Sequence, residues 1–175
     1  MKHVKSALLF FCLFSLGGNA ALAWDANAVK KANETIAAFK KKDGKLETFF
    51  KQAYGYAVFP TVGKGAMGIG GAHGSGVVYE KGKPVGETSL TQITIGFQLG
   101  GQAYSEIIFF KDKKTLDRFK NGNFELGAQA SAVAITAGAS ADVNYEKGVA
   151  VFTMAKGGLM YEASVGGQKF SYTPF

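Results

Sequence analysis

The hydrophobic positions after residue 23 recur first at the spacing of a helix. An apolar stripe runs along residues 24–42, and Asp43-Gly44 supplies a stop for this helix. The stripe consists of Val29, Ala32, Ile36 and Phe39. A second, shorter helix is predicted over residues 46–53, where apolar residues stand at i, i+3, i+4 and i+7. Both helices are expected to form a layer against the sheet that follows.

The first helix is also basic. Its lysines are Lys30, Lys31, Lys40, Lys41 and Lys42. A basic amphipathic helix can lie in a membrane interface, particularly with Trp24 at one end. The alternative is a helix that docks on the core through its stripe while its lysines face water. We favour docking and keep membrane contact as the second interpretation.

From Tyr56 onward the pattern becomes that of β-strands. Candidate strands cover 56–59, 66–72, 76–80, 85–88, 92–98 and 104–110, and the spacing suggests successive antiparallel hairpins. The turn Lys81-Gly82-Lys83-Pro84 separates two of them, because glycine allows positive φ and proline fixes its own φ.

A short surface helix is predicted at 112–120, between Asp112 as the cap and the turn Asn121-Gly122. Residues 124–144 are rich in alanine, serine and glycine, and we favour strands over helix there. Strands at 149–155, 159–165 and 168–172 complete the sheet, and the paired glycines between them predict hairpins. The predicted fold class is α+β: a glycine-rich, many-stranded antiparallel sheet, barrel-like or a sandwich, with two or three short helices.

Glycines are concentrated between Gly63 and Gly76. Such density persists only where backbone approaches something closely or adopts positive φ, so the segment is a packing or binding feature. A G-x-G-x-x-G pattern starts at Gly63, but no helix can open after it, which argues against a dinucleotide site. A candidate backbone site for a phosphate headgroup consists of Gly63, Gly65, Gly68, Gly70 and Gly71. Its candidate cations are Lys64, Lys81 and Lys83, which alternatively only keep the turns soluble.

Residues 1–23 read as a secretory signal peptide. Lys2 and Lys5 are followed by an apolar run and by the cleavage motif Ala21-Leu22-Ala23. The run contains Cys12, and removal of the signal leaves no cysteine for a disulfide or a thiolate site. Of 20 basic residues two belong to the signal, so the exported chain keeps a positive excess over its 13 acidic residues. The excess favours anionic partners, and export favours lipid over nucleic acid.

No residue set in the exported chain predicts catalysis or metal binding. It has one histidine, His73, and its carboxylates are scattered without the spacing of a calcium loop. No nucleophile elbow is present, and neither an enzymatic activity nor a cofactor is expected. Glu106 lies within an otherwise apolar strand, and we expect its side chain to point outward rather than to be buried and paired.

The glycine-rich stretch also carries a resemblance. Residues 53–86, the run SLTQITIGFQLGGQ from Ser89 to Gln102 and the EIIFF that follows resemble the SYLF domain family, whose yeast members are actin-binding cortical patch proteins. The resemblance covers residues 46–175, after a basic helical segment at 24–45. It implies a non-enzymatic domain that binds lipid, phosphoinositides in eukaryotic members, and in some members actin filaments.

The first functional hypothesis is therefore an exported protein, periplasmic or secreted, that binds anionic phospholipid headgroups at a membrane surface. The alternative is an envelope scaffold that binds a protein partner. An actin partner is doubtful for a protein with a bacterial-type signal.

Overall fold

The computed structural model describes residues 25–175 except 68, 96–101, 123, 128–129 and 158–162. The predicted signal peptide, Cys12, Trp24 and Gly68 lie outside the described residues. The chain begins with α1 (Ala26–Lys42), a 3₁₀ turn η1 (Gly44–Leu46) and α2 (Glu47–Gln52). Asp25 caps α1 by accepting a hydrogen bond from the amide of Asn27.

The strands form one sheet in the order β7-β5-β6-β4-β1-β2-β3-β8. Their bounds are β1 (Gly55–Met67), β2 (Ile69–Glu80), β3 (Lys83–Ile95), β4 (Gln102–Phe110), β5 (Ser131–Ala134), β6 (Val149–Ala155), β7 (Ala163–Ser164) and β8 (Lys169–Pro174). A third helix, α3 (Lys113–Lys120), follows β4. All pairs are antiparallel except β5–β6, which is parallel. The sheet is therefore mixed rather than wholly antiparallel.

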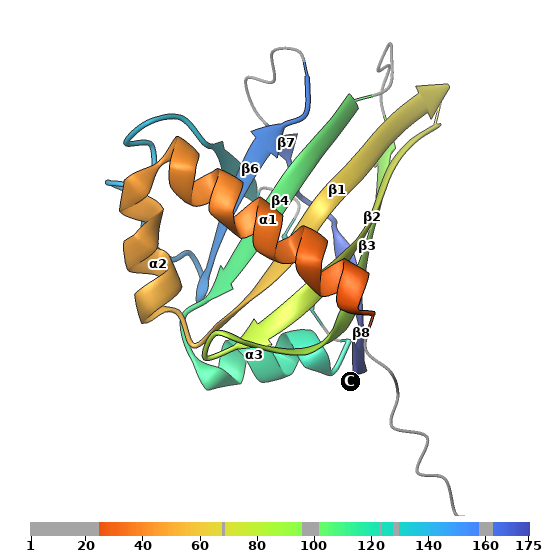
Figure 1. Cartoon of the computed structure of the whole chain (residues 1–175). Helices are drawn as coiled ribbons and strands as arrows, with labels where there is room; N and C mark the ends of the chain where they lie inside the picture. The colour runs from red at the N-terminus through yellow and green to blue at the C-terminus, as the bar shows by residue number, and fades with distance from the viewer. Residues whose placement is uncertain (1–24, 68, 96–101, 123, 128–129, 158–162) are drawn as a thin grey trace, which may run out of the picture.

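The α+β class and the packing of the N-terminal helices on the sheet are confirmed (Figure 1). The sheet is neither a sandwich nor a closed barrel, because its described strands form one order with two ends, β7 and β8. These ends are nevertheless close. Ser164 and Lys169 are separated by five Cα steps, at most about 19 Å, whereas eight strands laid flat would extend roughly 34 Å. The sheet must therefore curl strongly.

Curling produces two hydrophobic layers. The inner face packs on itself and on α3, through residues such as Phe59, Ile108 and Phe119. The outer face packs on α1 and α2, through residues such as Val58, Phe109 and Phe152. Residues 56–59 of β1 and 107–110 of β4 are buried along their whole length. The central strands thus bury both faces, which is why they read as continuous apolar runs.

Some strand boundaries differ from the sequence-based expectation. Met67 pairs with Ile69, so the strand predicted at 66–72 is divided between β1 and β2. The short strands predicted at 56–59 and 76–80 are parts of the longer strands β1 and β2. Glycine-rich segments carry little side-chain pattern, so the turn position had no clear hydrophobic signal. The turn at Lys81-Gly82 is confirmed, with positive φ at both residues.

The C-terminal half differs more. Among the described residues of 124–144, 131–134 form the one strand, and turns occupy 137–142. The hairpin predicted at Gly166-Gly167 is wrong: β7 pairs with β5, whereas β8 pairs with β3 at the other end of the sheet order. The paired glycines form a link between sheet edges, and Gly167 has a positive φ of 76°.

Gly76 shows why part of the glycine stretch must be glycine. A Cβ on Gly76 would collide with the carbonyl oxygen of Val58 and lie 2.8 Å from a ring carbon of Phe59. We expect Gly76→Ala to lower the free energy of unfolding by about 1–3 kcal/mol, because backbone must move to relieve the overlap. Urea denaturation measures this change.

Gly65→Ala is the matched control, since nothing lies within 4 Å of a Cβ at Gly65. Its free energy of unfolding should stay within about 0.5 kcal/mol of the wild-type value. Equal effects of the two substitutions would refute the close-packing explanation.

Candidate functional site

The lysines of α1 lie on its solvent-facing side. Val29, Ala32 and Phe39 of the stripe are buried against the sheet, so docking is confirmed as the role of this face. Lys40 instead contacts α2: its Nζ forms an ion pair with Glu47 Oε2 at 2.9 Å and lies over the ring of Phe50. The exposed lysines of α1 are Lys30, Lys31, Lys41 and Lys42. A membrane could meet these charges without any insertion of the apolar stripe.

The structure does not bring Lys64 together with Lys81 and Lys83. Gly55 pairs with Glu80 beside the Lys81-Gly82 turn, whereas Lys64 pairs with Ala72 nine residues further along β1. Nine residues of strand extend about 30 Å. Lys64 is half-buried, and burial lowers the pKa of its ammonium group. One phosphate cannot contact all three lysines.

The described members of the candidate glycine site lie within the sheet. Gly63 in β1 pairs with both β2 and β4, and Gly65 in β1 pairs with β2. Gly70 and Gly71 are in β2, between β1 and β3. Strands with a neighbour on each side use their amides in the ladder. The helix start that would aim free amides at a phosphate does not follow these glycines. We therefore do not place a phosphate cradle there.

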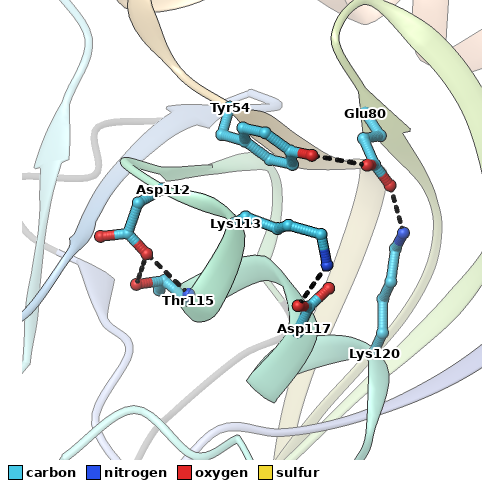
Figure 2. Close-up of polar contacts among 7 residues, drawn as sticks. All are labelled: Tyr54, Glu80, Asp112, Lys113, Thr115, Asp117 and Lys120. Carbon is cyan, nitrogen blue, oxygen red and sulfur yellow. Dashed lines mark hydrogen bonds and ion pairs between the residues drawn. The ribbon is translucent and has the colours of Figure 1, made fainter.

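A different group of charged residues gathers at the end of the sheet that carries α3 (Figure 2). Tyr54 is its centre: its amide donates to the carbonyl of Phe110, and its own carbonyl accepts from the amide of Lys81. Its hydroxyl donates to Glu80 at 3.1 Å. Glu80 also pairs with Lys120. The carboxylate at the end of β2 therefore holds together Tyr54, which follows α2, and the last residue of α3.

Helix α3 is fixed in place by its own polar contacts. Asp112 accepts from the amide and the hydroxyl of Thr115, which caps the helix. Lys113 and Asp117 form an ion pair of 2.6 Å one turn apart. The hydrogen bond from Lys120, opposed by burial and aided by the bond from Tyr54, lowers the pKa of Glu80. Glu80 therefore stays ionised and keeps Lys120 in place at neutral pH.

The remaining cations at this end face solvent. We call them the α3-end basic surface: Lys81, Lys83, Lys111, Lys114 and Arg118. Among the described residues, none of these five has a carboxylate within ion-pair distance. Lys81 lies over the ring of Tyr54 and Arg118 over that of Phe124, which holds their side chains near the surface. The result is a positive surface with a fixed scaffold.

Sequence reasoning identified only Lys81 and Lys83 of this surface. Lys114 and Arg118 lie in the surface helix predicted at 112–120, and Lys111 directly precedes it. None of these three was predicted to have a binding role. The dense basic run from Lys111 to Lys120 was a visible signal. Its proximity to Lys81 could not be read from the chain, because it depends on the pairing of β1 with both β2 and β4.

Glu106 corrects a further expectation. Its side chain is fully buried rather than outward, on the inner face of β4 between Tyr104 and Ile108. Both faces of β4 are covered, so strand alternation offers no exposed side. The amide of Gln168 donates to Glu106 Oε2 at 3.0 Å and also contacts the hydroxyl of Tyr104 at 3.3 Å. Thr153 is the cross-strand partner of Glu106 on β6.

The polar atoms of this interior group are incompletely paired. Glu106 Oε1, Thr153 Oγ1 and Gln168 Oε1 are buried without a hydrogen-bond partner among the described residues. Burial raises the pKa of Glu106 to about 8, an effect that the bond from Gln168 reduces. The carboxyl is therefore protonated at neutral pH, and a neutral acid can donate a hydrogen bond where a carboxylate cannot.

The described part of the chain holds no group of three or more His, Cys, Asp or Glu side chains that could bind a metal ion. Within the same residues, no helix has the length and apolar character needed to cross a membrane.

The family whose description reads "Las17-binding protein actin regulator", Ysc84, matches residues 91–173. This part of the chain is similar to the Ysc84 family. The Ysc84 domain is the SYLF domain, so the resemblance found in the sequence is confirmed. The match runs from within β3 to within β8 and includes β4, α3 and β6. It therefore contains Glu106, Gln168 and three of the five residues of the α3-end basic surface.

The chain is also similar to "Beta cell expansion factor A" of Aeromonas veronii, with 29% identity over 123 residues. The aligned region covers 69% of this chain and 46% of that protein. The chain thus spans less than half the length of this Ysc84-family relative.

The buried carboxyl of Glu106 makes stability depend on pH. In the unfolded chain a glutamate ionises near 4.5, whereas folded Glu106 keeps its proton until about 8. Between these values the folded state binds more protons, so the free energy of unfolding falls as pH rises. Glu106→Gln removes this dependence. We expect the variant to gain stability relative to wild type, on the order of 1–4 kcal/mol, between pH 4.5 and pH 8.

Urea denaturation of both proteins at several pH values in this range measures the difference. Glu146→Gln, which changes an exposed carboxyl, is the control and should follow the wild-type curve. Parallel pH curves for wild type and Glu106→Gln would show that Glu106 is ionised in the folded protein.

Proposed function

We propose that this protein is exported and binds anionic phospholipid headgroups by electrostatic attraction, with the α3-end basic surface as the principal contact. The observation that carries the proposal is the group of exposed cations without carboxylate partners, held on a scaffold fixed by Tyr54, Glu80 and Lys120. The Ysc84 match supports a binding role for the domain that contains α3. Phosphoinositides are the multiply charged headgroups that such a surface attracts most strongly.

Electrostatic attachment fits the way α1 is packed. Its apolar stripe is already buried, so the described helices offer no free apolar face for insertion. A lysine near an anionic surface contributes about 1 kcal/mol, and several acting together give a useful affinity without insertion. Such binding weakens with salt, since the Debye length falls from about 10 Å at 0.1 M to about 3 Å at 1 M. The exposed lysines of α1 would add to the same attraction.

Co-sedimentation with vesicles tests the contact surface. The variant Lys81→Glu/Lys83→Glu/Lys111→Glu/Lys114→Glu reverses four charges of the α3-end basic surface. We expect it to lose binding to anionic vesicles by about 100-fold or more, because attraction is replaced by repulsion. Lys120 is left unchanged, since it holds Glu80, and so the fold is preserved.

The matched control reverses four exposed lysines of α1: Lys30→Glu/Lys31→Glu/Lys41→Glu/Lys42→Glu. It changes the net charge equally and leaves Lys40, which pairs with Glu47, in place. A larger loss in this control would move the principal contact to α1. Equal binding of the wild-type protein to neutral and anionic vesicles at all salt concentrations would refute the electrostatic function.

Export is the part of the proposal that rests on residues 1–23. We expect the protein recovered from the cells that produce it to begin at Trp24, as determined by intact mass or N-terminal sequencing. It should be found in the periplasm or the medium. Retention of Met1 in the recovered protein would contradict export by cleavage at this site.

Protein binding is the second candidate function, favoured by the family description, which names Las17 binding and actin regulation. The edge strand β8 offers a physical means. Within the described residues β3 is the one strand that pairs with it, and a single bridge joins Glu125 to Lys169 at its start. The rest of its outer edge can accept a strand from a partner. Insensitivity of the cellular location to both charge-reversal variants would favour this function.

A further inference from the structure

A groove of about 590 Å³ lies between the first turns of α1 and the outer face of the sheet. Its lining comes from α1 and its cap, β1, β2, β3 and β8. Figure 1 shows the N-terminal end of α1 on the side of the sheet that carries β3 and β8. The α3-end basic surface contributes no residue to this groove.

The floor of the groove is a row of hydroxyl groups that crosses four strands. Thr61 pairs with Ser75, Ser75 with Ser89, and Ser89 with Ser171. All four residues line the groove. Neighbouring strands are about 4.8 Å apart, so the row extends roughly 14 Å. The hydroxyls of Ser89 and Ser171 are 2.7 Å apart, which shows that they point to the same side.

Charges of both signs accompany the row. Lys31 of α1 lines the groove, and Lys156 donates to Thr61 Oγ1 at 2.7 Å at the β1 end of the row. Two carboxylates also line the groove: Asp25, the cap of α1, and Glu87, which is paired with Thr173 at the β8 side. Among the described residues, neither Lys31 nor Glu87 has an ion-pair partner within 4 Å. A ligand with both charges can therefore meet two free counter-charges.

We propose that this groove binds a zwitterionic phosphate ester that carries a primary amine. The ammonium of Lys31 and the hydroxyls of the row donate hydrogen bonds to the phosphate oxygens. The carboxylate of Glu87 accepts from the ammonium of the ligand, which has three N–H donors. A trimethylated amine has no N–H donor, so the groove discriminates against choline esters.

The ligand is recognised by its headgroup chemistry alone. Nine of the thirteen residues that line the groove are polar, and the contacts proposed here all go to the headgroup. The same chemistry occurs in phosphatidylethanolamine and in free glycerophosphoethanolamine. This inference does not rest on the proposed function, because it concerns other residues and a ligand without net charge.

The test is titration of the purified protein with glycerophosphoethanolamine, followed by NMR chemical shifts of backbone amides. We expect saturable shifts at Ser75, Ser89 and Lys31, with a Kd on the order of 1 mM for a ligand of this size. Glycerophosphocholine should bind at least about 5-fold more weakly. A second arm compares vesicles of phosphatidylcholine with and without phosphatidylethanolamine. Enrichment on the vesicles that contain phosphatidylethanolamine identifies the lipid as the source.

Lys31→Ala and Glu87→Gln should each weaken binding by about 5-fold or more. Lys30→Ala is the matched control: it removes the neighbouring exposed lysine, which does not line the groove, and should leave the Kd unchanged. Absence of saturable shifts, equal loss in Lys30→Ala, or equal binding of glycerol phosphate without the amine would each overturn the proposal. The four-lysine variant of the α3 end should keep this binding, which separates the two proposals.

Discussion

Burial of both faces of the central strands is the constraint on which the rest of this structure depends. Residues 56–59 of β1 and 107–110 of β4 have no side exposed to water. Both faces of such a sheet must be shielded from water by other parts of the chain. Helices α1 and α2 cover the outer face, while the inner face closes on itself by curling and by contact with α3. The short link between β7 and β8 then becomes possible, because curling brings the sheet edges near each other.

This double coverage determines where binding can occur. The apolar stripe of α1 is used in the outer layer, so its lysines are left at the surface. Helix α1 covers only part of the outer face, and the hydroxyl row of β1, β2, β3 and β8 remains accessible beside it as a groove. Tyr54 and Glu80 anchor α3 below the sheet, where its cations meet those of the β2–β3 turn. The positions of the α3-end basic surface and of the groove beside α1 thus follow from which helices cover which face of the sheet.

Glu106 is an ionisable residue at a fully buried position in the core. An apolar residue at this position would avoid the desolvation that raises the pKa of Glu106 to about 8. The surroundings reduce the conflict only in part, through the amide of Gln168. Three buried oxygen atoms around it, on Glu106, Thr153 and Gln168, have no hydrogen-bond partner among the described residues. Local inconsistencies of this kind in an otherwise consistent sequence are where function or strain is concentrated.

The sequence by itself determined the helices, the class of the fold and the resemblance to a family. Helical periodicity and caps are local properties, so α1, α2 and α3 were predictable almost to the residue. The tertiary structure alone decided the side to which Glu106 points, the separation of Lys64 from Lys81, and the gathering of Lys81 with Lys111 and Lys114. It also decided the buried contact of Asp43 with Ser140, 97 residues apart in the chain. These features depend on strand order and register, and in a glycine-rich chain few side chains specify either one.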